Sequence, residues 1–175
     1  MSISVSTKEV VQSPVRTLIV GVGNLLLGDE GVGWHIINNL SQIAMPAHVR
    51  ILDCGCDLLN LVSYIYKPRR IIVIDAIRAG GKPGQIHKFN FDELDAVRTQ
   101  KTSIHQLQIV DILRLLRETN PCLACCKITV MGIEPGALEL STELSEEVSK
   151  SIANLTRLVL EEISVLLLGK ESMVN

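Results

Sequence analysis

Aromatic side chains are scarce in this sequence: one Trp, two Tyr and two Phe make up 3% of its 175 residues. Ile, Leu and Val must therefore build most of the core, in a chain that is 47% hydrophobic. A core of this kind is typical of an α/β protein whose parallel sheet is covered on both faces. At this length we expect one domain with enough chain to bury a full core.

Other absences exclude whole classes of function. No apolar run approaches the ~20 residues that span a bilayer, so the sequence predicts no membrane association. The formal net charge is −2 with both signs mixed, which offers no basic surface for nucleic acid. Residues 1–13 lack a charged start and an apolar block, so we expect a loose tail and no secretion signal. The odd count of five cysteines then favours reduced thiols in a cytoplasmic protein.

Short apolar runs alternate with helical patterns along the chain, which predicts βαβ units. We expect a tail at 1–15, a single domain at 16–169 and a C-terminal tail at 170–175. The predicted architecture is a three-layer α/β/α sandwich, with a mostly parallel twisted sheet of about five strands and helices on both faces. The predicted strands are 16–21, 49–53, 70–76 and 127–132, and an edge strand, considered as antiparallel, runs through His87, Phe89 and Phe91. The first two predicted helices are 30–44, with Ile43 on its inner face, and 58–66. A third helix is opened by the capping box of Ser103 and Gln106, and the last is 145–168 with Gly169 as its C-cap.

The most informative segment is a glycine-rich turn after the first apolar run, Gly21-Val-Gly23-Asn24-Leu-Leu-Leu-Gly28-Asp29-Glu30-Gly31-Val-Gly33. Such a turn usually brings backbone N–H groups and a helix N-terminus to an anion. Here the turn carries two consecutive acids, Asp29 and Glu30, which would repel a phosphate and suit a cation. The segment therefore predicts a cation site after the first strand.

Parallel α/β sheets bind ligands at the carboxyl ends of their strands. Three candidate metal ligands fall at that edge: Glu30 follows the first strand, Asp75 ends the most apolar strand and His105 opens a helix. A helix N-terminus disfavours imidazolium, so His105 would be held neutral, the form that binds metal. Two carboxylates and one imidazole could hold Zn, Ni, Mn or Fe and leave a position for water or substrate.

Each of these residues also has a structural interpretation. Glu30 would complement the helix dipole, Asp75 would accept backbone N–H groups, and His105 would be a capping or solvated side chain. Their common placement at one edge favours ligation. We expect Asp29 to face solvent or to cap the turn, and it ranks below Glu30.

These motifs resemble those of the endopeptidases that mature the large subunits of [NiFe]-hydrogenases. The resemblance runs from the first strand to the final helix. It rests on four separated motifs in the right order: the glycine-rich turn, Asp53-Cys-Gly55, Ile74-Asp75-Ala76 and His105-Gln106-Leu107. Cys54 stands where the family carries a glycine in an Asp-Gly-Gly-like turn.

The resemblance implies an activity, a substrate and a ligand set. Members of this family clip a short C-terminal extension from the hydrogenase large-subunit precursor once nickel is in place. The family's metal-contacting residues fall on Glu30, Asp75 and His105, which would read the nickel held by the precursor. Nickel would thus come with the substrate, and Zn or Cd could substitute at the site. The implied partner is the precursor, and we expect the enzyme itself to be a monomer.

Two routes to peptide-bond cleavage remain open. The metal could polarise the scissile carbonyl or activate water. Alternatively a carboxylate, Asp75 or the nearby Asp53, could act as general base on a water molecule. The catalytic candidates are therefore Asp75, Asp53 and Glu30.

Four other interpretations compete with this one. Cys54 and Cys56 could join Cys122, Cys125 and Cys126 in a zinc or iron–sulfur site, but the two groups are expected at opposite ends of the strands. A dinucleotide-binding turn is disfavoured by Leu26, which stands in place of the third glycine. A peptidyl-tRNA hydrolase would need a basic groove for RNA. The fourth is a nickel-binding chaperone that passes the metal on without hydrolysis.

Overall fold

The computed structural model describes residues 15–59, 61, 68–96, 104–121, 123–136 and 138–168, with the backbone alone for 94–96, 104–108 and 165–168. Within them, a five-stranded sheet has the order β2-β1-β3-β5-β4. All neighbouring strands are parallel except β4, which runs antiparallel to β5 at one edge. The elements are β1 (Thr17–Gly21), η1 (Gly28–Gly31), α1 (Val32–Ser41), β2 (Val49–Asp53), β3 (Arg70–Ala76), β4 (Ile86–Asn90), α2 (Phe91–Ala96), α3 (Ile104–Thr119), β5 (Lys127–Ile133) and α4 (Glu146–Leu168).

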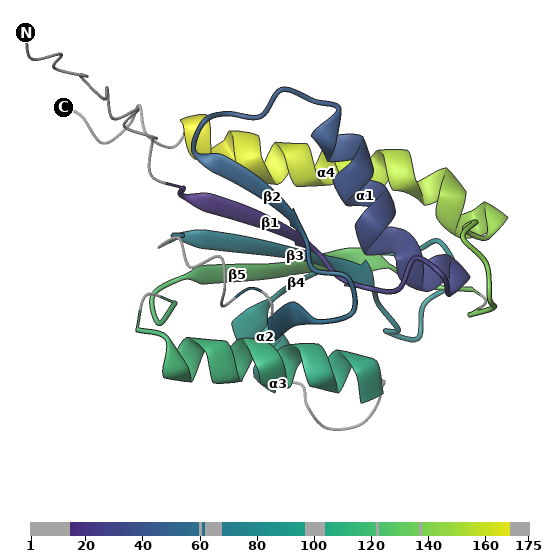
Figure 1. The fold of residues 1–175 in the computed structure, drawn as a ribbon, viewed down its shortest axis with the longest axis horizontal. Helices are drawn as coiled ribbons and strands as arrows, with labels where there is room; N and C mark the ends of the chain where they lie inside the picture. The colour runs from purple at the N-terminus through teal and green to yellow at the C-terminus, as the bar shows by residue number, and fades with distance from the viewer. Residues whose placement is uncertain are drawn as a thin grey trace, which may run out of the picture.

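Helices cover both faces of the sheet, as the sequence predicts (Figure 1). α1 and α4 lie on one face, and α2 and α3 lie on the other. Side chains of β3 alternate between the two: Ile72 and Ile74 join the core under α1 and α4, whereas Ile71 and Val73 join the core over α3. The predicted three-layer α/β/α sandwich is confirmed.

Aliphatic residues build both cores, which explains how the chain manages with so few aromatic side chains. The six apolar residues of the central strand, Ile71 to Ile74 with Ala76 and the adjoining Ile77, are all at most 6% exposed. No described helix is long and apolar enough to cross a membrane.

Close backbone contact between α1 and the sheet depends on Gly33. A Cβ atom at this position would lie 2.1 Å from the Val22 carbonyl oxygen and 2.9 Å from that of Ile74. Both distances are far inside van der Waals contact with atoms that cannot rotate away. Glycine therefore lets the first turn of α1 pack directly on the ends of β1 and β3.

Strand positions are confirmed to within a residue, and the differences concern helices. The predicted helix 30–44 is a 3-10 turn followed by a shorter α1, and Ile43 lies beyond its end, 41% exposed instead of on the inner face. Phe91 does not continue the edge strand but begins the short helix α2, which the sequence reading missed. Ser103, Gly169 and most of the predicted helix 58–66 fall outside the described residues.

Candidate active site

Four connections meet at the carboxyl ends of the parallel strands. They follow β1, β2, β3 and β5, and they include the residues 22–31, 54–59, 77–85 and 134–145. α3 also begins at this end, because it runs back to the loop that enters the amino end of β5. The predicted ligands Glu30, Asp75 and His105 therefore share one edge of the molecule.

Asp75 lies at the centre of this edge and is 1% exposed. It pairs in register with Gly132 on the neighbouring strand β5. The alternation along β3 places it on the face of Ile71 and Val73, which α3 covers. Burying a carboxylate at the end of an apolar strand is costly unless it is hydrogen-bonded or binds a cation. A functional role for Asp75 stays a prediction, which this buried position at the carboxyl edge favours.

Gly23 joins Asp75 to the loop that carries Glu30. A Cβ atom on Gly23 would lie 3.6 Å from Oδ1 of Asp75 and 1.9 Å from the carbonyl oxygen of Glu30. Its φ of +127° is also a conformation that other residues rarely adopt. The Glu30 carbonyl and the positive φ therefore require glycine here, and the turn lies in ordinary van der Waals range of the Asp75 carboxylate.

Glu30 itself is half-buried in η1. Its carboxylate makes no hydrogen bond or ion pair within the part of the chain that the structure describes. Among the described side chains, no three His, Cys, Asp or Glu residues lie close enough to hold a metal ion. The third predicted ligand, His105, is the second residue of α3, and its side chain lies outside that description. Ligation by these three residues stays a prediction.

Asp29 does not face solvent, which corrects the expectation for this residue. It is fully buried, and its carboxylate accepts hydrogen bonds from the Gly136 N–H at 2.8 Å, the Ser145 N–H at 2.7 Å and the Ser145 hydroxyl at 2.9 Å. The side chain ties η1 to the connection between β5 and α4. No local pattern could have revealed this, because both partners are more than 100 residues away.

Asp53 ends β2 at the same edge, but its carboxylate is exposed. Oδ1 accepts a hydrogen bond from the Gly55 N–H at 3.0 Å and so closes the turn after the strand. β2 is separated from β3 by β1, and strands lie ~4.8 Å apart, which puts Asp53 roughly 10 Å from the central strand. A catalytic role for Asp53 stays a prediction, and the geometry gives Asp75 the better placement.

The departure at Cys54 leaves this turn intact. The positive φ of +54° falls on Gly55, and the Cys54 N–H donates to the Gly21 carbonyl at 2.9 Å. Burial, with Asp53 and Asp57 nearby, raises the pKa of the Cys54 thiol to about 11. Cys54 is therefore a neutral, buried thiol that packs in the core.

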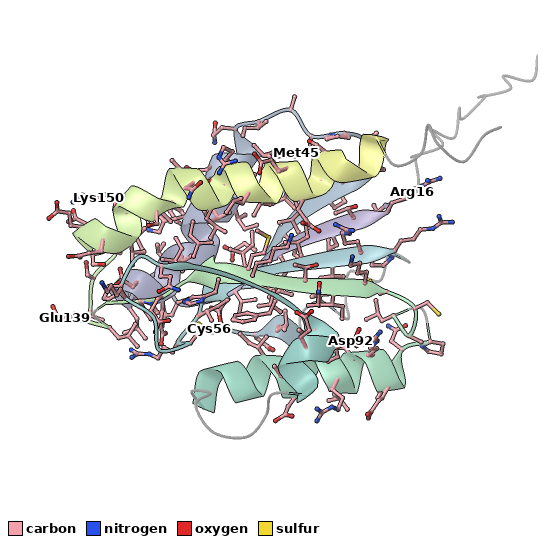
Figure 2. All side chains as sticks on the ribbon, turned by 180° about the vertical axis from the view of Figure 1, so that it is seen from behind. Arg16, Met45, Cys56, Asp92, Glu139 and Lys150 are labelled. Atoms are coloured by element: carbon pink, nitrogen blue, oxygen red, sulfur yellow. The ribbon has the colours of Figure 1, made fainter. Side chains whose placement is uncertain are left out.

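The cysteines fall into two groups that are far apart. Cys54 and Cys56 follow β2 at the carboxyl edge, whereas Cys125 and Cys126 precede β5 at the amino edge. Figure 2 shows Cys56 on the side of the molecule away from Arg16, which precedes β1. Cys122 lies outside the described residues. The strands separate the two groups of described thiols, as the sequence argument expects.

Glu134 is a buried acid at this edge that the sequence reading missed. Its carboxylate accepts the N–H groups of Ala79 at 2.9 Å, Gly80 at 3.3 Å and Gly81 at 3.0 Å, and it lies 2.9 Å from Nε2 of His87. Burial alone raises the pKa of Glu134, but these hydrogen bonds together lower that pKa below its ordinary value of 4.5. Glu134 thus anchors the connection that follows Asp75.

Comparison with known proteins yields one consistent family. The profile described as hydrogenase maturation protease matches residues 34–162. A putative hydrogenase maturation protease of Methanocaldococcus jannaschii is 33% identical over 150 residues, which are 83% of this chain and 95% of that protein. The hydrogenase 2 maturation protease of Escherichia coli is 35% identical over 140 residues, 79% of this chain and 84% of that one.

Solved structures of the same family match the fold of this chain. The hydrogenase maturating endopeptidase HybD of E. coli has a TM-score of 0.73 at 33% identity and covers 85% of this chain and 92% of its own. The hydrogenase maturation protease HybD of Thermococcus kodakarensis also has a TM-score of 0.73, at 28% identity, covering 83% and 97%. These matches decide against the dinucleotide-binding and peptidyl-tRNA hydrolase alternatives.

Proposed function

Because this chain belongs to the hydrogenase maturation protease family and is an endopeptidase, we propose that it removes a C-terminal peptide from the nickel-loaded precursor of a [NiFe]-hydrogenase large subunit. It recognises the nickel of this substrate through Glu30, Asp75 and His105. The observation that carries the proposal is the placement of Asp75. It is buried at the carboxyl end of the central strand, on the face covered by α3, and beside the glycine turn that leads to Glu30.

The substrate's nickel would be the metal of this site. The carboxylates of Glu30 and Asp75 would supply negative charge, and the imidazole of His105 would complete a donor set that suits nickel or zinc. Binding the metal of the precursor would fix the position of the attached peptide, so that binding also orients the scissile bond. Nickel in this position would polarise the carbonyl that is attacked.

Asp75 is the preferred general base. With one carboxylate oxygen on the nickel, its other oxygen would hold a water molecule against the scissile carbonyl and accept the proton of that water. Asp53 is the alternative, but its Oδ1 already accepts the Gly55 N–H. Glu30 would then act on the metal and not on the water.

Processing of nickel-loaded precursor tests the proposal, with the product measured by mass spectrometry. We expect Glu30→Gln, Asp75→Asn and His105→Ala to slow the release of the C-terminal peptide at least about 100-fold. Asp53→Asn serves as the matched control and should retain most activity. Wild-type rates for all three variants would contradict the site, and loss of activity only in Asp53→Asn would make Asp53 the base.

Thermal unfolding of the same variants separates a ligand from a structural residue. We expect His105→Ala to lower the melting temperature little, because a residue in the first turn of a helix is rarely part of the core. A nickel-loaded precursor that keeps its full mass after incubation with the wild-type protein would contradict the proposed cleavage. If the wild-type protein also transfers nickel to precursor purified without it, the protein is a metal chaperone.

A further inference from the structure

Exposed large apolar side chains concentrate at the active-site end of the molecule. In the described chain they are Leu26, Ile43, Leu59, Leu115, Leu138 and Leu140. Only Ile43 and Leu115 lie outside the connections at the carboxyl edge of the sheet. Leu26, Leu138 and Leu140, which we call the leucine patch, come from two connections that are hydrogen-bonded to each other. Leu140 is 86% exposed and Leu26 is 57% exposed.

Backbone hydrogen bonds hold the two connections side by side. Leu27 and Ser141 form a parallel β-bridge. The Ser141 N–H donates to the Leu26 carbonyl at 3.0 Å, and the Gly28 N–H donates to the Ser141 carbonyl at 2.7 Å. Leu26 and Leu140 each adjoin a residue of this bridge, so their backbone positions are fixed relative to one another.

The buried Asp29 and the half-buried His35 reinforce the same junction. Asp29 binds Gly136 and Ser145 at either end of the segment that carries Leu138 and Leu140. His35 on α1 hydrogen-bonds to the backbone of Thr142 within it. The backbone beside Leu26 and Leu140 is therefore tied down by hydrogen bonds, and a surface that is already ordered loses little conformational entropy when a partner binds.

Two exposed acids lie on the same connection as Leu138 and Leu140. The side chains of Glu139 and Glu143 are exposed, and neither forms an ion pair with any residue that the structure describes. Glu139 lies at the end of the molecule opposite Arg16, where the strands finish (Figure 2). A binding partner for this surface would therefore present apolar side chains together with positive charge.

We propose that the leucine patch is the docking surface for the hydrogenase large-subunit precursor, and that it binds an apolar segment of that protein flanked by basic side chains. The inference rests on the proposed function, because it places the apolar segment of the precursor beside the residues that would contact the precursor's nickel. Glu30 lies four residues after Leu26 on the same connection. A precursor docked on the patch would thus bring its metal site to the edge that carries Glu30 and Asp75.

The test measures the kinetics of peptide release from purified nickel-loaded precursor. We expect Leu140→Ser to raise KM about tenfold, the effect of truncating one buried contact of an interface, and to leave kcat within about twofold. The double variant Leu26→Ser/Leu140→Ser should raise KM further. Leu115→Ser is the matched control, since Leu115 is 50% exposed but lies on α3, ten residues beyond His105, or ~15 Å along the helix.

Charge reversal tests the basic part of the partner. Glu139→Lys/Glu143→Lys should raise KM at low salt, and added salt should then weaken binding less than it does for the wild type. Unchanged KM in the leucine variants, or an equal rise in Leu115→Ser, would overturn the docking surface. So would a dimer that Leu140→Ser converts to monomer without any effect on processing. These outcomes all require an active wild-type enzyme, whereas failure of the wild type to shorten the precursor would contradict the proposed function itself.

Discussion

Asp29 and Glu30 are adjacent acids with different tasks. Asp29 is buried and accepts three hydrogen bonds from Gly136 and Ser145. Glu30 is half-buried, and its carboxylate makes no hydrogen bond or ion pair within the described chain. The pair thus combines an anchor with a candidate ligand. Because the anchor fixes η1 on the connection between β5 and α4, it also fixes the backbone of Glu30.

Replacement of Asp29 by Asn should therefore destabilise the protein. The amide of Asn supplies a single acceptor oxygen in place of the two that now receive these donors, and it turns N–H groups toward them. We expect the free energy of unfolding to fall by about 2–3 kcal/mol, the cost of buried donors left without a charged acceptor. Urea denaturation measures it. Asp92→Asn is the control, because the exposed Asp92 forms an ion pair with Arg117 that should contribute little. Equal midpoints for the two variants would contradict an anchoring role.

At the level of elements, the sequence predicts the strands best. β2 and β3 have the predicted bounds, because each is an apolar run closed by an acid or a turn. The sequence did not predict α2, because Phe89 and Phe91 have the two-residue spacing of a strand. In the structure the strand ends at Asn90 and the helix begins at Phe91. Local patterns carry no information about long-range contacts, and so the roles of Asp29 and Glu134 could not be predicted. The common edge of Glu30, Asp75 and His105 could be predicted, because parallel α/β topology alone places ligand-binding residues at the carboxyl ends of the strands.

The connection between β3 and β4 is held by the side chain of Glu134, the residue that follows β5. Glu134 holds the backbone of Ala79 to Gly81, which follows the Asp75 strand. We expect Glu134→Gln to lower the free energy of unfolding by about 1–3 kcal/mol at pH 7, because the charged acceptor of these bonds is lost. The pKa of Glu134 is lower in the folded protein than its ordinary 4.5, so this stabilisation is present above pH 4.5 and is lost as the pH falls through the folded-state pKa.

Urea midpoints at pH 7, 4.5 and 3.5 check this dependence. The difference between wild type and Glu134→Gln should shrink as the pH falls below 4.5. Glu143→Gln is the control, since that side chain is exposed and makes no ion pair with described residues. A difference that stays constant or grows toward acid would show that the carboxylate charge of Glu134 does not stabilise this connection.

In the whole molecule, the apolar side chains of the cores and the polar side chains of the candidate site occupy different regions. The aliphatic cores occupy the body of the sandwich, and the polar groups of interest gather where the parallel strands end. The candidate ligands come from the β1–α1 connection, from β3 and from the start of α3, so no single segment carries the site. A metal ion that enters with the substrate would bridge these elements, and recognition would then require both the docked protein and its nickel.

This arrangement predicts that cleavage depends on nickel in the precursor and not on metal in the free enzyme. Precursor purified without nickel should be processed at least about 100-fold more slowly, since loss of a polarising metal removes about 3 kcal/mol or more from transition-state binding. Treatment of the enzyme alone with a chelator, followed by its removal, should leave the rate on loaded precursor unchanged. Mass spectrometry of the product follows both reactions. If the nickel-free precursor is cut at the same rate, Glu30, Asp75 and His105 do not read the substrate's metal; if only the chelated enzyme loses activity, the three residues hold a resident ion of their own.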